Sequence, residues 1–181
     1  MFLIEIVASV IAGSVSLRAD ALDFLGDAAN YAVATAVVGL ALHWRARAAL
    51  LKGDVMGMFG LWVTGSTIYG AITATVPKAE IIGAIGLLAL AVNLGVAGLL
   101  YRYRGADSQT LSVWLCTRND CIANIAVMLA GAGVWASATA WPDIAVAAII
   151  ALLGLSSAVR IIRQVLGEMR SIGIPRGLPA E

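Results

Sequence analysis

Residues 81–101 read IIGAIGLLALAVNLGVAGLLY, a run of 21 residues without a charged side chain. A helix of about 20 apolar residues spans the ~30 Å hydrocarbon core of a bilayer. The chain of 181 residues follows the same trend, since 61% of it is hydrophobic and only 13% is charged. Soluble domains are about half apolar and about one quarter charged. The composition therefore predicts an integral membrane protein.

Five further apolar segments lie around this run, separated by short polar breaks. The predicted membrane helices cover residues 1–12, 19–43, 54–75, 81–101, 111–138 and 143–164. Short connections predict one all-α domain, a six-helix transmembrane bundle over residues 1–164, with a short cytoplasmic tail over 165–181. The first segment is short for a span, but it lacks a basic start and contains Glu5. We therefore interpret it as a membrane helix and not as a signal peptide.

Basic residues predict the orientation of the bundle. Nine of the twelve Lys and Arg residues fall between segments two and three, between four and five, or around the end of segment six and in the tail. Cytoplasmic loops carry such an excess. We therefore expect both termini in the cytoplasm of a multi-pass cell-membrane protein (the inner or plasma membrane, if the source is bacterial). The nine residues are Arg45, Arg47, Lys52, Arg102, Arg104, Arg160, Arg163, Arg170 and Arg176.

Net charge and cysteine spacing exclude two other kinds of protein. The formal net charge is +1, which gives no reason to expect nucleic acid as a partner. The two cysteines, Cys116 and Cys121, lie five residues apart in one apolar segment. On a helix they point roughly 140° apart and cannot reach disulfide geometry. The cysteines therefore do not indicate an oxidising compartment.

Acidic residues inside the predicted spans indicate a site. A charged residue at the centre of a membrane helix costs roughly 2.5–3.5 kcal/mol on insertion scales, so such residues mark functional sites. Asp23 and Asp27 are four residues apart in segment two and share a helix face. Cys116 and Asp120 have the same spacing in segment five. No other span has two potential metal ligands at this spacing.

The two pairs are expected at a similar depth in the bilayer. Asp27 lies roughly 12 Å into its segment from the outside, and Asp120 roughly 13 Å into its own from the cytoplasm, at 1.5 Å per residue. If the helices are neighbours, three carboxylates and one thiolate converge near the midplane. Tetrahedral O and S donors suit zinc and similar divalent cations. Because the ligands must lose protons to bind metal, protons compete for the site, which is the physical basis of proton-coupled transport.

These same residues carry a resemblance to a known family. Residues 14–27, SVSLRADALDFLGD, resemble the second-helix signature of the cation diffusion facilitator family, a Ser/Leu-rich turn followed by Ala-Asp-Ala and an Asp/His-x-x-x-Asp pair. Residues 116–120, CTRND, stand where the fifth helix has His-x-x-x-Asp. The resemblance covers essentially the whole chain. It implies a metal/proton antiporter that exports divalent transition metal, usually as a homodimer, with Asp23, Asp27, Cys116 and Asp120 as transport-site ligands.

Three departures from the family pattern are visible. Cys116 replaces the usual histidine, and a softer ligand favours cadmium or zinc or accompanies a degraded site. The family's cytoplasmic metal-binding domain is absent after about Arg163, as is a His-rich loop between segments four and five. The first helix is shorter than usual. The metal is expected as transported substrate, and no cofactor is predicted.

Other polar residues have plainer interpretations. Asp20 is expected to have a structural or capping role. Cys116 alone would be read as a small buried hydrophobe, and only its spacing from Asp120 indicates a ligand. Asn93 is expected to form a helix–helix hydrogen bond. Asn30 and Asn124 are expected to support the ligands without binding the metal.

Two other functions compete with transport. The first, an intramembrane enzyme, is not expected, because the chain has no Ser/His pair, no His-Glu-x-x-His and no P-loop. The second alternative is a non-transporting or truncated subunit or membrane scaffold of the same fold. Metal binding that depends on Asp27 and Asp120 would distinguish a transporter from such a scaffold.

Overall fold

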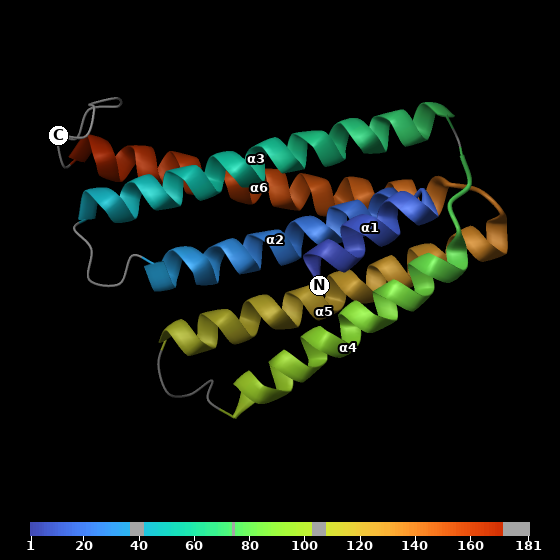
Figure 1. The fold of residues 1–181 in the computed structure, drawn as a ribbon, viewed down its shortest axis with the longest axis horizontal. Coiled ribbons are helices and arrows are strands. Elements are labelled where there is room, and N and C mark those ends of the chain that lie inside the picture. Colours follow the sequence, from blue (N-terminus) through green and yellow to red (C-terminus); the bar gives the residue numbers. More distant parts are fainter. Residues whose placement is uncertain (37–41, 74, 103–107, 172–181) are drawn as a thin grey trace.

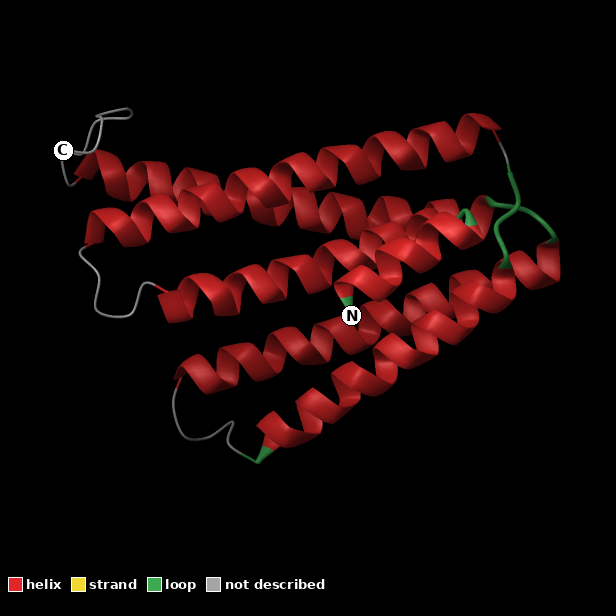
Figure 2. Cartoon of the chain, in the orientation of Figure 1, coloured by secondary structure: helices red, strands yellow, loops and turns green. Residues whose placement is uncertain are grey.

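The computed structural model describes residues 1–36, 42–73, 75–102 and 108–171, which form six α-helices and no strand (Figure 2). The helices are α1 (Phe2–Ala12), α2 (Val15–Ala36), α3 (Leu42–Thr73), α4 (Ala79–Tyr101), α5 (Ser108–Ser137) and α6 (Trp141–Ser171). The predicted all-α, six-helix fold is confirmed.

Helix α2 lies inside the bundle and contacts four other helices. It packs against α1, α3, α5 and α6, while α3 pairs closely with α6 and α4 with α5. Figure 1 shows α1 running beside α2 from about the middle of the bundle to one end. With 11 residues, α1 is roughly 16 Å long, or about half a bilayer core. The start of α1 therefore lies near the depth where the predicted site is expected.

Four helices of the described part are long and apolar enough to cross a membrane. They contain the stretches Arg47–Thr73, Ala79–Tyr101, Thr117–Ser137 and Trp141–Gly167. Phe2–Ala12 is a shorter apolar helix. Helix α2 has 22 residues, but Arg18 and three aspartates lower its hydropathy. The chain is a multi-pass membrane protein whose most polar helix is surrounded by apolar ones.

Several helices extend beyond the apolar segments that predicted them. Helix α3 begins at Leu42, not near residue 54, and α6 continues to Ser171, past residue 164. These extensions pack on each other, since Val165 is buried against Ala49, Leu50 and Ile161. Hydropathy marks the part of a helix that matches the bilayer, whereas the helix itself continues wherever its ends find a partner.

Burial in the bundle differs from that in a soluble protein. Polar side chains are buried together with apolar ones, while many large apolar side chains on α3, α4 and α6 are exposed. In lipid the exterior is apolar, and polar groups are favoured only where they meet one another or line a polar space. The buried polar set includes Glu5, Asp20, Asn93, Thr117, Asn124 and Asp143.

The turn between α1 and α2 is held by a carboxylate from a distant helix. Gly13 ends α1 with φ of 69°, in the left-handed region that glycine tolerates. Asp143, in the first turn of α6, then accepts hydrogen bonds from the Ser14 hydroxyl (2.6 Å) and the Val15 amide (2.8 Å). It also accepts from the amide and hydroxyl of Ser16. This cap fixes the end of α2, and with it the rotation of its aspartates.

Two glycines allow α2 to approach its neighbours closely. A Cβ atom on Gly26 would lie 2.8 Å from Met56 Cε of α3, and one on Gly154 of α6 would lie 2.7 Å from Leu22 Cδ2. Small residues at helix contacts are the usual means of close packing in membranes. Helix α2 is therefore held firmly on the α3 and α6 sides, and its acidic residues face the remaining space toward α1, α4 and α5.

Candidate metal centre

The acidic residues of α2 lie along the interior of the bundle. Asp20 is buried, with 1% of its surface exposed, and Asp23 and Asp27 are half-buried. Asp23 lies close enough to both Asp20 and Asp27 for their charges to interact. The spacing of three and four residues that indicated one face in the sequence thus produces a column of carboxyl groups along α2.

Helix α5 brings Asp120 to this column. The carboxyl groups of Asp120 and Asp27 lie within hydrogen-bonding distance of each other, and Asp120 also feels the charge of Asp23. Asp120 Oδ2 is buried and accepts no hydrogen bond. The structure therefore places two of the four predicted ligand residues, Asp27 and Asp120, beside each other, with Asp23 near enough for its charge to act on Asp120.

Cys116 is the fourth predicted ligand, and its side chain lies outside the described part of the structure. Its backbone belongs to α5, one helical turn before Asp120. Among the side chains that are described, no three Asp, Glu, Cys or His groups converge tightly enough to hold a metal ion. The four-ligand site thus stays a prediction, and what the structure contains is its central contact between α2 and α5.

A cavity of about 280 Å³ reaches Asp27. Its polar lining comes from Asp27 of α2, Asn93 of α4 and Thr117 of α5. The start of α1 forms part of its wall through Met1 and Phe2. Asn93, expected to form a helix–helix hydrogen bond, thus lies at a cavity wall with its side chain buried. Carbonyl, hydroxyl and carboxylate oxygens around one cavity suit a cation that retains part of its water.

Asp20 has a different environment from the one expected. The capping role is wrong, because α2 begins at Val15 and Asp143 caps it. Asp20 instead lies within hydrogen-bonding distance of Glu5 of α1. Both carboxyl groups are buried, and neither the two Glu5 oxygens nor Asp20 Oδ2 has a hydrogen-bond donor.

Two residues of this region were missed by sequence reasoning. Glu5 was read only as an interruption of an apolar run, although a charge in a membrane helix is itself a signal of function. Asp143 has no local signal, because its partners Ser14 and Ser16 lie 129 and 127 residues away in the sequence. Asn124, expected near the ligands, is fully buried on α5, and neither of its amide atoms has a partner.

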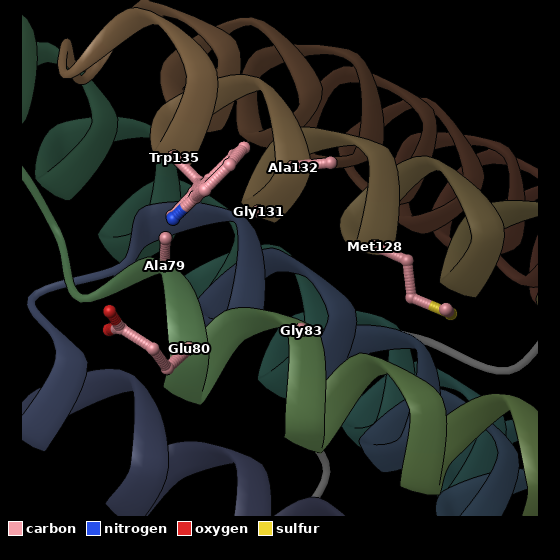
Figure 3. A pocket seen from close by; sticks show the side chains of 7 residues that line it. All are labelled: Ala79, Glu80, Gly83, Met128, Gly131, Ala132 and Trp135. Atoms are coloured by element: carbon pink, nitrogen blue, oxygen red, sulfur yellow. The ribbon is translucent and has the colours of Figure 1, made fainter.

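A second cavity of about 270 Å³ lies between α4 and α5 (Figure 3). Its lining is mostly apolar, with Glu80 as the charged residue among Ala79, Gly83, Met128, Gly131, Ala132 and Trp135. Figure 3 shows Trp135 beside Ala79, where α5 and α4 approach. A lone carboxylate offers too few ligands for a transition metal. The candidate centre is therefore the contact between Asp27 and Asp120.

Comparison with protein families identifies the family of this chain. The family model described as the cation efflux transmembrane domain matches residues 1–169. The comparison with curated proteins returned no match. A match over nearly the whole chain shows membership, so the chain belongs to the cation diffusion facilitator family of metal-cation transporters.

Proposed function

We propose that this family member exports a divalent transition-metal cation, zinc or one similar to it, from the cytoplasm in exchange for protons. The proposed ligands are Asp23, Asp27, Cys116 and Asp120. The metal is cargo, so we propose neither a resident cofactor nor an enzymatic step.

The observation that supports this proposal is the approach of Asp27 to Asp120 within the bundle. Two like unit charges about 4 Å apart repel by roughly 4 kcal/mol at an effective dielectric constant of about 20. A cation between the carboxylates converts this repulsion into attraction. A divalent cation supplies such a positive charge together with a preference for oxygen ligands.

Exchange for protons follows from the same oxygens. A carboxylate that binds metal must be deprotonated, so metal binding releases protons and protons displace metal. If the centre opens alternately to the two sides of the membrane, a proton gradient drives the cation in the opposite direction. The cavity that reaches Asp27 supports access to the centre from one side.

Orientation and assembly are parts of the proposal as well. The excess of basic residues in one set of connections supports cytoplasmic termini. In Figure 1 the start of α1 and the end of α6 are directed toward the same end of the bundle. The family resemblance of residues 14–27 and 116–120 supports a homodimer. Export from the cytoplasm follows from this orientation and from the inward direction of the usual proton gradient.

Flux into proteoliposomes under an imposed pH gradient tests the proposal. Zinc, cadmium, cobalt, iron and manganese are compared, with Asp27→Ala alongside as the site variant. Glu80→Gln removes an exposed carboxylate on α4 and serves as the matched control. We expect uptake of at least one metal that depends on the gradient, collapses in Asp27→Ala and persists in Glu80→Gln.

Other results would overturn the proposal in distinct ways. Flux that persists in Asp27→Ala would refute the site assignment while leaving a transporter. No flux of any of the five metals, from protein shown to be folded, would favour a non-transporting subunit or scaffold. Flux that ignores the pH gradient would refute proton exchange alone.

A further inference from the structure

Glu5 of α1 and Asp20 of α2 form a second carboxyl pair. The antiparallel α1–α2 hairpin places their side chains within hydrogen-bonding distance. Glu5 is 0% exposed and Asp20 is 1% exposed. Asp20 lies seven residues before Asp27, or roughly 10 Å closer to the α1–α2 turn. The pair is therefore separate from the Asp27–Asp120 contact and lies on the capped side of it.

Three of the four oxygen atoms of this pair have no hydrogen-bond donor in the described structure. Both carboxylate oxygens of Glu5, and Oδ2 of Asp20, are buried without a hydrogen-bond partner. The nearest hydroxyl on α1, that of Ser9, donates to the Ile6 carbonyl oxygen at 2.8 Å. The guanidinium of Arg18, two residues before Asp20, lies 5.8 Å over the Trp62 ring. Two adjacent buried carboxylates without donors cannot both remain charged, so one positive charge must accompany them.

Charged groups on the neighbouring helices do not supply that positive charge in full. Glu5 interacts with the Met1 amino group at the start of α1 and with Asp23 of α2. Asp20 interacts with Asp120 of α5. The two aspartates add negative charge, and burial further disfavours ionisation of both members of the pair.

Burial distinguishes a proton from a metal ion at this position. A transition metal needs about four ligands, and this pair offers only the carboxyl groups of Glu5 and Asp20. Water could supply further ligands only where there is room, and both carboxyl groups are essentially inaccessible. A proton needs only one oxygen from each residue. The geometry therefore favours a proton over a metal ion.

We propose that Glu5 and Asp20 share a bound proton and form a proton-carrying site distinct from the metal ligands. Its role in exchange rests on the proposed metal/proton function. Asp20 senses the charge at Asp120, and Glu5 senses the charge at Asp23. A cation arriving at those aspartates adds positive charge nearby, so the shared proton leaves the pair toward the cavity that reaches Asp27, and the cation stabilises the carboxylate left behind. Binding of the two cations is thereby coupled through charge alone.

Infrared spectroscopy of the purified, metal-free chain in detergent tests the shared proton directly. A protonated carboxylic acid has a carbonyl stretching band that a carboxylate lacks. We expect this band at neutral pH in the wild type, and a lower band intensity in Glu5→Gln/Asp20→Asn, since the carboxyl groups of Asp23, Asp27 and Asp120 are common to both proteins. Glu80→Gln, the exposed control, should leave the band unchanged. An equal band in the wild type and the double variant would overturn the proposal.

The single variants cover the case in which the double variant does not fold. Glu5→Gln and Asp20→Asn each replace an acid by an amide of nearly the same shape. Because each removes one half of the shared-proton contact, each should shift or weaken the band. A band unaltered in both singles would overturn the proposal as firmly as the double variant would.

Proton release on zinc binding separates this proposal from the proposed function. Zinc is added to weakly buffered protein, and a pH indicator counts the protons released per zinc bound. We expect the double variant to bind zinc within a few-fold of wild type and to release about one proton fewer. Equal release would overturn the coupling role. If wild type binds no zinc, the proposed function fails, while the infrared result still decides whether the proton is shared.

Discussion

Asp143 and Asp120 are both carboxylates held between transmembrane helices, yet their surroundings are opposite. Asp143 accepts hydrogen bonds from two hydroxyls and two backbone amides at the start of α2. Asp120 faces the carboxyl group of Asp27, and its Oδ2 has no donor. The residues around Asp143 supply hydrogen-bond donors to its carboxylate, whereas those around Asp120 leave its Oδ2 without one.

The difference teaches how to separate structural from functional charges in a membrane protein. A buried carboxylate surrounded by donors is stabilised by the fold and stabilises it in return. A buried carboxylate beside another carboxylate destabilises the fold unless a mobile cation joins them. By this criterion Asp143 is structural, whereas we propose that the Asp27–Asp120 and Glu5–Asp20 contacts bind a metal ion and a proton, respectively.

Replacing Asp143 should produce the largest effect on stability. Asp143→Ala leaves the Ser14, Val15 and Ser16 donors buried without an acceptor, and we expect it to lower the free energy of unfolding by about 3 kcal/mol or more. Denaturation in detergent measures the change. Asp143→Asn keeps one acceptor oxygen, so its free energy of unfolding should lie between those of the wild type and Asp143→Ala. Asp143→Ala protein as stable as wild type would show that Asp143 does not stabilise the fold, and it would then not differ from Asp120 in this respect.

Lowering the pH should weaken metal binding while leaving the cap intact. Metal and protons compete for Asp27 and Asp120, so affinity should fall as pH falls, by about tenfold per pH unit for each proton displaced. Zinc titrations between about pH 6 and about pH 8 measure this slope. The slope should be the same in Asp143→Asn protein that remains folded. Affinity independent of pH would mean that no ligand exchanges a proton.

Replacing Cys116 should change which metal binds. Cys116→Ser substitutes a hard oxygen for a soft sulfur, so the ratio of cadmium to manganese affinity should fall by about tenfold. Competition binding with both metals measures the ratio. Manganese affinity of the same variant is the control, because a general loss of folding lowers both affinities and leaves their ratio unchanged. An unchanged ratio in folded protein would exclude Cys116 as a ligand.

The cavity residue Asn93 should have the smallest effect. Asn93→Ala removes an amide oxygen from the cavity that also contains Asp27, and we expect zinc affinity to fall by about tenfold or less. Leu94→Ala, on the exposed face of the same helix, is the matched control. Equal affinities in the two variants would show that the cavity plays no part in binding.

Sequence predicted the six helices for reasons that are local. Hydropathy identifies each segment, and depth places Asp27 and Asp120 at a similar level, whereas the contact between α2 and α5 was only a condition of the predicted site. The lengths of α3 and α6 escaped prediction, because their ends are held by contacts such as Val165 with Leu50, and not by lipid.

The partners of Asp143 and Glu5 could not be predicted for a different reason. Their contacts depend on how helices distant in sequence rotate about their axes, which no local pattern encodes. The aspartate that caps α2 lies beyond three intervening helices, and the Glu5–Asp20 contact depends on the register of the α1–α2 turn. A charge in an apolar helix signals importance, but only the fold distinguishes a cap from an incomplete site.

Zinc affinity in a double-mutant cycle of Asp27 and Asp120 tests the central claim most directly. Equilibrium dialysis compares wild type, Asp27→Asn, Asp120→Asn and the double variant, all shown to be folded. If the two carboxylates hold one cation, each single variant should bind zinc about 100-fold more weakly, and the double variant should be little worse than either. Wild-type affinity in the single variants, or losses that simply add, would contradict a shared site.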